Sequence, residues 1–337
     1  MDKAKSLTSL IDKSFYSAHF MDADLWYPHV RQVCHKHGFG CGRVTPGLPG
    51  TFPTFVVESD CEHIQLPFPE FVVKFFGPLY NGLDSFGIER GIGYWLNQQT
   101  VSIHSPRILA EGQLDIDWHY LIFEHVPGMS IGQVRDQLSA DDWISVAFHL
   151  GEFMHQLHSV ESFCLLDLSP VFQFSWERYA SFLRRQRLDC LINHQTWNDL
   201  PAHLLDQLED FILPVEQLVD FSEQPYLIHA DLTADHLLGE VVDGRWQTHA
   251  IIDWGDAMTG NILYELVALH LDLFQSDRHL LRIYLEAYDL PAFYQRDFPR
   301  KALSMVMLHQ FPMPARVYDA HKDVGTLQEL AERLFAF

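Results

Sequence analysis

The chain has 337 residues, of which 47% are hydrophobic, so it is long enough to fill the core of one large or two ordinary domains. It carries 23 basic and 45 acidic side chains, which gives a formal net charge of −22 at pH 7. A surface this acidic repels the phosphates of nucleic acids and of anionic lipids, so we expect neither as a partner. Acidity that serves only solubility is the alternative interpretation, and the charge by itself identifies no substrate.

The sequence also indicates a compartment. It contains no uninterrupted apolar run long enough to span a bilayer, and its N-terminal segment lacks the apolar stretch of a signal peptide. The five cysteines are an odd number, and their spacing is not that of a disulfide framework. We therefore expect a cytoplasmic protein.

Up to about residue 125, short runs rich in Phe, Val and Ile alternate with turn residues, which predicts a β-rich domain over residues 1–125. One helix is predicted within this domain, over Gly82–Gln98, where apolar residues recur at roughly helical spacing. The predicted strands are Phe52–Glu58, Phe71–Phe76, Arg107–Ala110 and His119–Glu124.

After Pro127 and Gly128 the pattern becomes helical and predicts a second domain over residues 126–337. Its clearest helix is Ala140–Ser159, for which Ser139 is a suitable N-cap. The predicted fold class is α+β, with a small β-rich N-terminal lobe and a larger, mainly helical C-terminal lobe. Further helices are predicted around 176–190, 201–220, 262–275, 277–288 and 293–310, and strands over Tyr226–Ile228, Leu237–Val242 and Trp246–Ile252, the last two as a hairpin about Asp243-Gly244.

Two aspartates follow short apolar strands in this second domain. The strand Tyr226–Ile228 leads to Asp231, and Ala250–Ile252 leads directly to Asp253. We expect the two strands to lie side by side, which would bring both carboxylates to one edge of a sheet. Such a pair suits phosphoryl transfer, in which one carboxylate orients the attacking hydroxyl and the other holds the metal that neutralises the triphosphate.

These residues carry a resemblance to a known family. The spacing of His229, Asp231 and His236 resembles the H-x-D-x-x-x-x-N catalytic loop of the aminoglycoside phosphotransferase/choline kinase superfamily, and Ile252–Trp254 resembles that family's counterpart of the D-F-G motif. The run Gly260–Leu266 is similar to the continuation seen in hygromycin B phosphotransferases, although Asn261 stands where members often carry Asp. The resemblance implies a protein-kinase-like bilobal fold.

The same resemblance implies a phosphate clamp in the first domain. Lys74, within the apolar strand Val72–Phe75, resembles the lysine that reaches the α- and β-phosphates, and Glu89 stands where its partner would be. A lysine inside an apolar strand is costly unless it is paired, which independently favours a Lys74–Glu89 contact. An edge-strand lysine with its amine in water and an exposed helical glutamate are the alternative interpretations.

The resemblance also implies where a nucleotide is held. The segment Leu48–Thr54, with Thr51, resembles the family's nucleotide loop. The segment Phe123–Gly128, with Glu124 and Val126, resembles the hinge whose backbone meets the nucleotide base. The matching motifs occur in the family's order over roughly residues 45–275.

In this interpretation Asp231 is the base or orienter of the substrate hydroxyl, and His229 belongs to the catalytic loop as a structural residue rather than as a proton carrier. For Asp231 the alternative is an ordinary turn aspartate. Asp253 is the expected magnesium ligand, joined by His236 in the position where the family has a magnesium-binding asparagine. Imidazole is a poor magnesium ligand, so His236 could instead only brace the loop, favour another metal such as manganese, or leave the site inactive; we favour the brace.

The resemblance thus implies a small-molecule O-phosphotransferase that moves the γ-phosphate of ATP or GTP, with Mg²⁺, to a hydroxyl of a cationic small molecule. Aminoglycosides, aminocyclitols, amino alcohols, macrolides and sugars are the implied acceptors. A catalytically impaired nucleotide-binding protein on the same fold is the alternative. Acidic residues of the helical lobe could form a cation-binding wall, or simply a solvated surface: Asp199, Asp206, Glu209, Asp210, Asp272 and Asp277.

Overall fold

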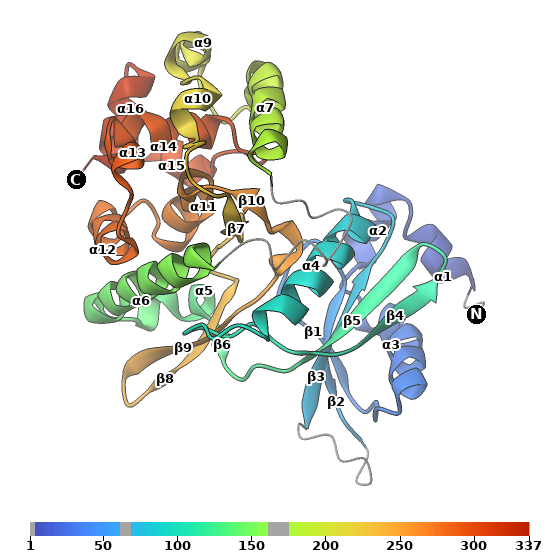
Figure 1. Ribbon diagram of the computed structural model, residues 1–337. Coiled ribbons are helices and arrows are strands. Elements are labelled where there is room, and N and C mark those ends of the chain that lie inside the picture. The colour runs from blue at the N-terminus through green and yellow to red at the C-terminus, as the bar shows by residue number, and fades with distance from the viewer. Residues whose placement is uncertain (1–3, 61–68, 161–174, 337) are drawn as a thin grey trace. The chain divides into compact units, whose positions relative to one another are not determined.

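The computed structural model describes residues 4–60, 69–160 and 175–336. The chain divides into two compact units (Figure 1). Unit 1 comprises Met1–Gln99, His104–Gly128 and Ala250–Gly255, and unit 2 comprises Thr100–Ile103, Met129–His249 and Asp256–Phe337. Within the described residues, the helices are too short or too polar to cross a membrane.

Unit 1 contains a five-stranded antiparallel sheet. The strand order is β1 (Val44–Pro46), β2 (Thr54–Glu58), β3 (Glu70–Phe76), β5 (Trp118–Glu124) and β4 (Ile108–Asp115). All four predicted strands are confirmed, and β4 is longer than predicted. The predicted helix is also confirmed, as α4 (Gly82–Leu96).

The two faces of this sheet pack against different helices (Figure 1). Successive side chains of a strand point to opposite faces, so Phe75 and Phe76 of β3 face different layers. Phe75 stacks on Trp26 of α3 (Ala23–His37), with ring centroids 4.7 Å apart. Phe76 packs against Phe86 of α4, with centroids 5.6 Å apart. The alternation places Lys74 on the α4 face, which is the face of its predicted partner.

Three helices before the sheet are missing from the sequence prediction: α1 (Ala4–Ser9), α2 (Lys13–His19) and α3. The side chains of Asp12 and Asp22 cap α2 and α3 by accepting hydrogen bonds from backbone N–H groups of the first turn. Gly38, with φ of 71°, ends α3 in the left-handed conformation that glycine adopts without strain. Pro28 lies inside α3, and an internal proline normally argues against a helix.

Unit 2 is mainly helical. The predicted helix Ala140–Ser159 is confirmed as α6, and Ser139 caps it reciprocally with Asp142. A single helix over 201–220 is wrong, because α8 (Ala202–Leu205), α9 (Leu208–Phe211) and α10 (Val215–Leu218) replace it. Pro214 explains the last break, since a proline disfavours helical geometry in the residue before it. The remaining helices are α5 (Ile131–Val134), α7 (Trp176–Trp197), α11 (Ile262–Ala268) with a π-helical turn (Leu269–Leu273), α12 (Arg278–Tyr288), α13 (Ala292–Gln295), α14 (Phe298–Met307), α15 (Ala315–Asp319) and α16 (Leu327–Phe335).

The strands of the second half form two small sheets. One sheet has the order β6 (Met129–Ser130), β8 (Leu237–Val242) and β9 (Arg245–Ile251), and the other pairs β7 (Tyr226–Ile228) with β10 (Met258–Gly260). The hairpin about Asp243 and Gly244 is confirmed, with φ of 50° and 76° at these residues. The prediction that the strands before Asp231 and Asp253 lie side by side is wrong. Strand β9 pairs with its own hairpin neighbour, and β7 pairs with β10.

Candidate active site

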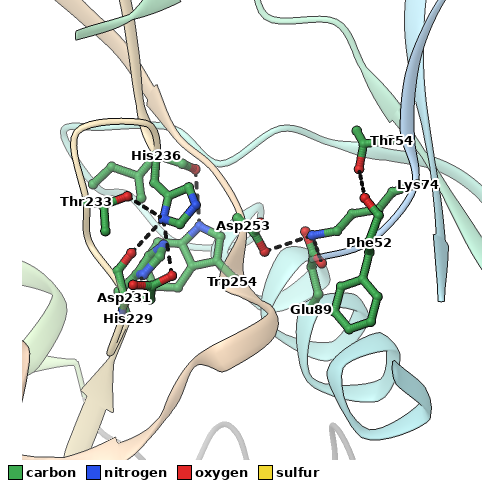
Figure 2. A network of polar contacts seen from close by, with 11 residues as sticks. Phe52, Thr54, Lys74, Glu89, His229, Asp231, Thr233, His236, Asp253 and Trp254 are labelled. Carbon is green, nitrogen blue, oxygen red and sulfur yellow. Dashed lines mark hydrogen bonds and ion pairs between the residues drawn. The ribbon is translucent and has the colours of Figure 1, made fainter. Parts of the chain in front are cut away.

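In unit 1, the amine of Lys74 lies between two carboxylates (Figure 2). Its Nζ donates to Glu89 Oε2 at 2.7 Å and to Asp253 Oδ1 at 2.8 Å. Lys74 and Glu89 are each only 5% exposed, whereas the Asp253 side chain is 29% exposed. The predicted Lys74–Glu89 contact is confirmed, and Asp253 joins it. We call these three residues the lysine cluster.

The charges of the lysine cluster are unequal. Burial disfavours the charged form of Lys74, but the attraction of Asp253 and Glu89 outweighs it and raises the pKa of the amine above its ordinary value. One positive charge then faces two negative charges. The cluster carries a net negative charge beside the partly exposed Asp253, an arrangement that attracts a further cation.

The backbone around Asp253 has an uncommon conformation. Asp253 has φ of 62°, a left-handed geometry that a short polar side chain tolerates better than a branched one. Trp254 follows it, and its indole Nε1 donates to the carbonyl of Ile251 at 3.1 Å. A Cβ added at Gly255 would lie 3.5 Å from both Asp253 Oδ1 and Glu89 Oε2. Gly255 therefore borders the cluster at van der Waals distance.

The predicted nucleotide loop lies beside the lysine cluster. A Cβ added at Gly50 would lie 3.9 Å from Asp253 Oδ2, and Lys74 Nζ lies 5.8 Å from the centroid of the Phe52 ring. The carbonyl of Phe52 accepts a hydrogen bond from Thr54 Oγ1 at 3.0 Å (Figure 2). The loop therefore reaches the cluster through both its backbone and its side chains.

In the predicted hinge, the charged side chain of Glu124 is engaged by a neighbouring residue. Both carboxylate oxygens of Glu124 accept hydrogen bonds from Arg107, from its N–H at 3.0 Å and from its Nε at 2.8 Å. Val126 is half-buried. Arg107 therefore binds both oxygens of the Glu124 carboxylate.

In unit 2, Asp231 lies in the loop between β7 and β8. His229 is fully buried, and its Nδ1 accepts a hydrogen bond from the backbone N–H of Asp231 at 3.3 Å. Ala230 between them has φ of 67°. These contacts make His229 a structural support of the loop, as the sequence predicts.

His236 supports the same loop from its other end (Figure 2). Its Nδ1 donates to the carbonyl of Asp231 at 2.6 Å and lies 3.8 Å from the Asp231 carboxylate. Thr233 Oγ1 lies 3.2 Å from the same nitrogen. Because a carbonyl can only accept, Nδ1 carries the ring proton. The geometry is that of the brace, the first of the three outcomes considered for His236.

The sequence prediction gives no role to Glu265, which the structure places beneath this loop. Glu265 Oε2 accepts from the N–H of His229 at 2.7 Å and of Ala230 at 3.3 Å. Burial raises the pKa of its carboxyl to about 7; the two N–H donors act in the opposite direction, and the charge of Asp231 adds to the rise. A single acidic residue in the apolar run Ile262–Val267 is the sequence signal that points to it.

Asn261, which departs from the family pattern, uses both ends of its amide. Its Oδ1 accepts from Tyr179 Oη at 3.1 Å and from the N–H of Tyr264 at 3.3 Å, which caps α11. Its Nδ2 donates to the carbonyl of Leu218 at 2.7 Å. An ionised aspartate has no N–H or O–H to donate to that carbonyl, so asparagine suits these contacts better.

Two of the six acidic residues that could form a cation-binding wall in the helical lobe already pair with basic side chains. Asp199 is buried and accepts from His194 Nδ1 at 2.9 Å, while His194 Nε2 faces the carbonyl of Met307 at 3.0 Å. Burial opposes the charged ring, but the hydrogen bonds to Asp199, Cys190 and the carbonyl of Met307, together with the charge of Asp199, outweigh it and raise the pKa of His194 to about 10. Asp272 pairs with Arg316. Both aspartates are therefore already neutralised.

The sequence defines the class of this protein as a phosphotransferase. The sequence model of the phosphotransferase enzyme family matches residues 55–300, and the chain belongs to that family.

Solved structures with the same fold include antibiotic phosphotransferases. The GDP complex of wild-type aminoglycoside 2'-phosphotransferase-IIIa has a TM-score of 0.66 and 17% identity, and the match covers 91% of this chain and 97% of that one. The streptomycin–ATP–APH(2")-IIa ternary complex has a TM-score of 0.56 and 17% identity, over 93% and 98% of the two chains. Macrolide 2'-phosphotransferase MphH from Brachybacterium faecium has a TM-score of 0.56 and 15% identity, and the match also covers 93% of this chain and 98% of that one. At these identities the likeness establishes the protein-kinase-like α+β fold.

One curated relative is Lysine-specific demethylase JMJ21 of Arabidopsis thaliana. It is 28% identical over 205 residues, a match that covers 52% of this chain and 22% of that protein. The matched half of the chain thus corresponds to about a fifth of that longer polypeptide.

The residues present fit a magnesium ion at Asp253 better than at His236. Asp253 offers carboxylate oxygens, the hard ligands that Mg²⁺ prefers, within a cluster of net negative charge. His236 offers ring nitrogen, and its Nδ1 is already bound to a carbonyl.

Proposed function

We propose that this protein transfers the γ-phosphoryl group of ATP or GTP to a hydroxyl of a small cationic acceptor. The observation that carries the proposal is the lysine cluster, in which a buried ammonium meets a helix carboxylate and the carboxylate that follows β9. In the proposed roles, unit 1 is the nucleotide-binding lobe and unit 2 carries the catalytic loop. We place the protein in the cytosol, where nucleoside triphosphates are made.

The proposed reaction uses the residues as follows. Lys74 binds phosphate oxygens of the nucleotide while Glu89 holds its amine in place, and Thr51, Glu124 and Val126 contribute backbone contacts. Asp231 accepts the proton of the acceptor hydroxyl as its oxygen bonds to the γ-phosphorus. The bond from that phosphorus to the β–γ bridging oxygen breaks, and the nucleoside diphosphate leaves. His229 and His236 hold the loop that presents Asp231.

Asp253 would hold Mg²⁺ through its carboxylate. The ion would supply charge neutralisation for the triphosphate.

The acceptor is proposed from chemistry. A chain of net charge −22 attracts cations, and two of the structures with the same fold are named as complexes with kanamycin and streptomycin. We therefore propose an aminoglycoside, an aminocyclitol or a related amino alcohol.

A coupled assay of diphosphate release tests this function. The purified protein is given ATP or GTP with Mg²⁺ or Mn²⁺ and a panel of aminoglycosides, amino alcohols and matched neutral sugars. We expect acceptor-dependent release from a cationic member of the panel and none from the Asp231→Asn control. Nucleotide binding without any acceptor-dependent release would support the alternative, a catalytically impaired nucleotide-binding protein.

A further inference from the structure

The helix α2 reaches the predicted nucleotide loop through one hydroxyl. Tyr16 on α2 is 3% exposed, and its Oη donates to the backbone carbonyl of Thr51 at 2.7 Å. Residues 4–54 precede the segment that matches the family, so this contact comes from outside the matched region. We propose that Tyr16 is a positioning residue for nucleotide binding, an inference that rests on the function proposed above.

The ring of Tyr16 is itself fixed in place. Asp12 caps α2 through the N–H groups of Ser14 and Phe15, and the Tyr16 ring stacks on Phe20 with centroids 5.4 Å apart. The ring also contacts Tyr80, at 5.7 Å. A hydroxyl held by a capped helix and by ring contacts can define the direction of a loop carbonyl at small entropic cost.

The loop carbonyls are held by donors from different places. The carbonyl of Phe52 accepts from Thr54 Oγ1 at 3.0 Å, and that of Pro53 accepts from the N–H of Phe75 at 2.9 Å. Both donors belong to strands β2 and β3, which flank the cluster. The carbonyl of Thr51 is instead bound from α2 by Tyr16. The hydroxyl thus adds an anchor that the sheet does not provide.

The hydrogen bond from Tyr16 to the carbonyl of Thr51 also affects the direction of the next backbone N–H, that of Phe52. The peptide between Thr51 and Phe52 is trans, so its C=O and N–H point in opposite directions. Fixing the carbonyl toward α2 directs the N–H of Phe52 away from α2. The side chain of Phe52 contacts the proposed phosphate clamp, with its ring centroid 5.8 Å from Lys74 Nζ, and a Cβ added at Gly50 would lie 3.9 Å from Asp253 Oδ2, so the loop borders the clamp on both sides of this peptide. Tyr16 thereby orients a backbone N–H for a phosphate oxygen.

The test is Tyr16→Phe, which removes the hydroxyl and keeps the ring. Tyr120→Phe is the matched control, because Tyr120 Oη also joins the N-terminal helices to the sheet, through His37 Nε2 at 2.8 Å, without touching the loop. Each variant of the full chain is titrated with Mg²⁺-ATP and Mg²⁺-GTP by calorimetry, and its melting temperature is measured. Steady-state kinetics follow with any acceptor found in the panel.

We expect Tyr16→Phe to weaken nucleotide binding by roughly three- to tenfold, the worth of one hydrogen bond, with kcat and the acceptor KM unchanged. The two variants should lower the melting temperature by similar amounts, because each loses one hydroxyl hydrogen bond. Tyr120→Phe should leave nucleotide affinity as in the wild type. Equal affinities for Tyr16→Phe and wild type would overturn the role of Tyr16 while leaving the proposed function intact. Equal weakening by both variants would reduce Tyr16 to a general stabiliser. A wild-type chain that binds neither nucleotide would overturn both proposals.

Discussion

The lysine cluster of unit 1 and the Asp231 loop of unit 2 are held in shape by different kinds of contact. In the cluster, charged side chains hold one another: Lys74 bonds to Glu89 and Asp253. In the loop, buried side chains hold the backbone, because Glu265 accepts from two loop N–H groups and His236 donates to the carbonyl of Asp231. The cluster should therefore respond to changes of charge, and the loop to the loss of groups that bind its main chain.

The largest expected effect is the fall in kcat caused by replacing Asp231. Asparagine has the size and shape of aspartate and leaves the backbone contacts of Asp231 to His229 and His236 in place, so Asp231→Asn should leave the fold and nucleotide affinity unchanged. Loss of the proton acceptor should lower kcat by roughly 10²–10⁴-fold. Steady-state kinetics beside calorimetric nucleotide titration provide the measurement. Near-normal turnover would contradict the assignment of Asp231.

The lysine cluster should respond to charge removal in two ways. Lys74→Met should weaken nucleotide binding by roughly 10–100-fold through the lost phosphate contact. It should also destabilise unit 1 by about 3–5 kcal/mol, because Glu89 is left buried beside another carboxylate without its ammonium partner. Urea unfolding and calorimetric titration measure the two effects.

The double variant Lys74→Met/Glu89→Gln separates these effects. The double variant should be more stable than Lys74→Met, since no unpaired charge is left at position 89. Its nucleotide affinity should stay as low as that of Lys74→Met. Strict addition of the two single losses of stability would show that Lys74 and Glu89 are not coupled.

Glu265 should make the stability of unit 2 depend on pH. Its carboxyl has a pKa of about 7 in the fold against an ordinary value of 4.5, so the folded state favours the protonated form. This contribution is fully present below pH 4.5 and is lost as the pH rises through 7, by at most ~3 kcal/mol. Glu265→Gln keeps an acceptor oxygen without the titration, so its unfolding free energy should vary less over this range.

Urea unfolding at a series of pH values measures this dependence. The exposed Glu209 offers the control, because Glu209→Gln should reproduce the wild-type profile. If Glu265→Gln retained the wild-type slope, another group would be responsible for it.

The smallest expected effect is that of the His236 brace. His236→Ala removes one hydrogen bond to the carbonyl of Asp231 and should lower kcat by up to roughly tenfold. His236→Asn retains a hydrogen-bond donor, so its kcat should fall less than that of His236→Ala. Turnover that falls equally in both variants would show that the imidazole does more than brace the loop, and replacing Mg²⁺ by Mn²⁺ would then reveal whether it binds metal.

Much of this protein follows from its sequence. The strands of unit 1, the helix α6 and its Ser139 cap follow from local periodicity and turn residues, which act over a few residues. The Lys74–Glu89 contact was also predictable, because a lysine inside an apolar strand requires a partner and the strand alternation directs it toward α4.

Other features depended on the tertiary structure. The side-by-side placement of the strands before Asp231 and Asp253 was wrong, because strand pairing is decided by competition among segments and β9 pairs with its hairpin neighbour. Glu265 supports the Asp231 loop from a later helix, and Tyr16 reaches Thr51 from an earlier one. A local pattern can mark Glu265 as a buried acid, but it does not encode which groups these side chains meet, since such contacts arise only when distant segments pack and a buried N–H or carbonyl requires a partner.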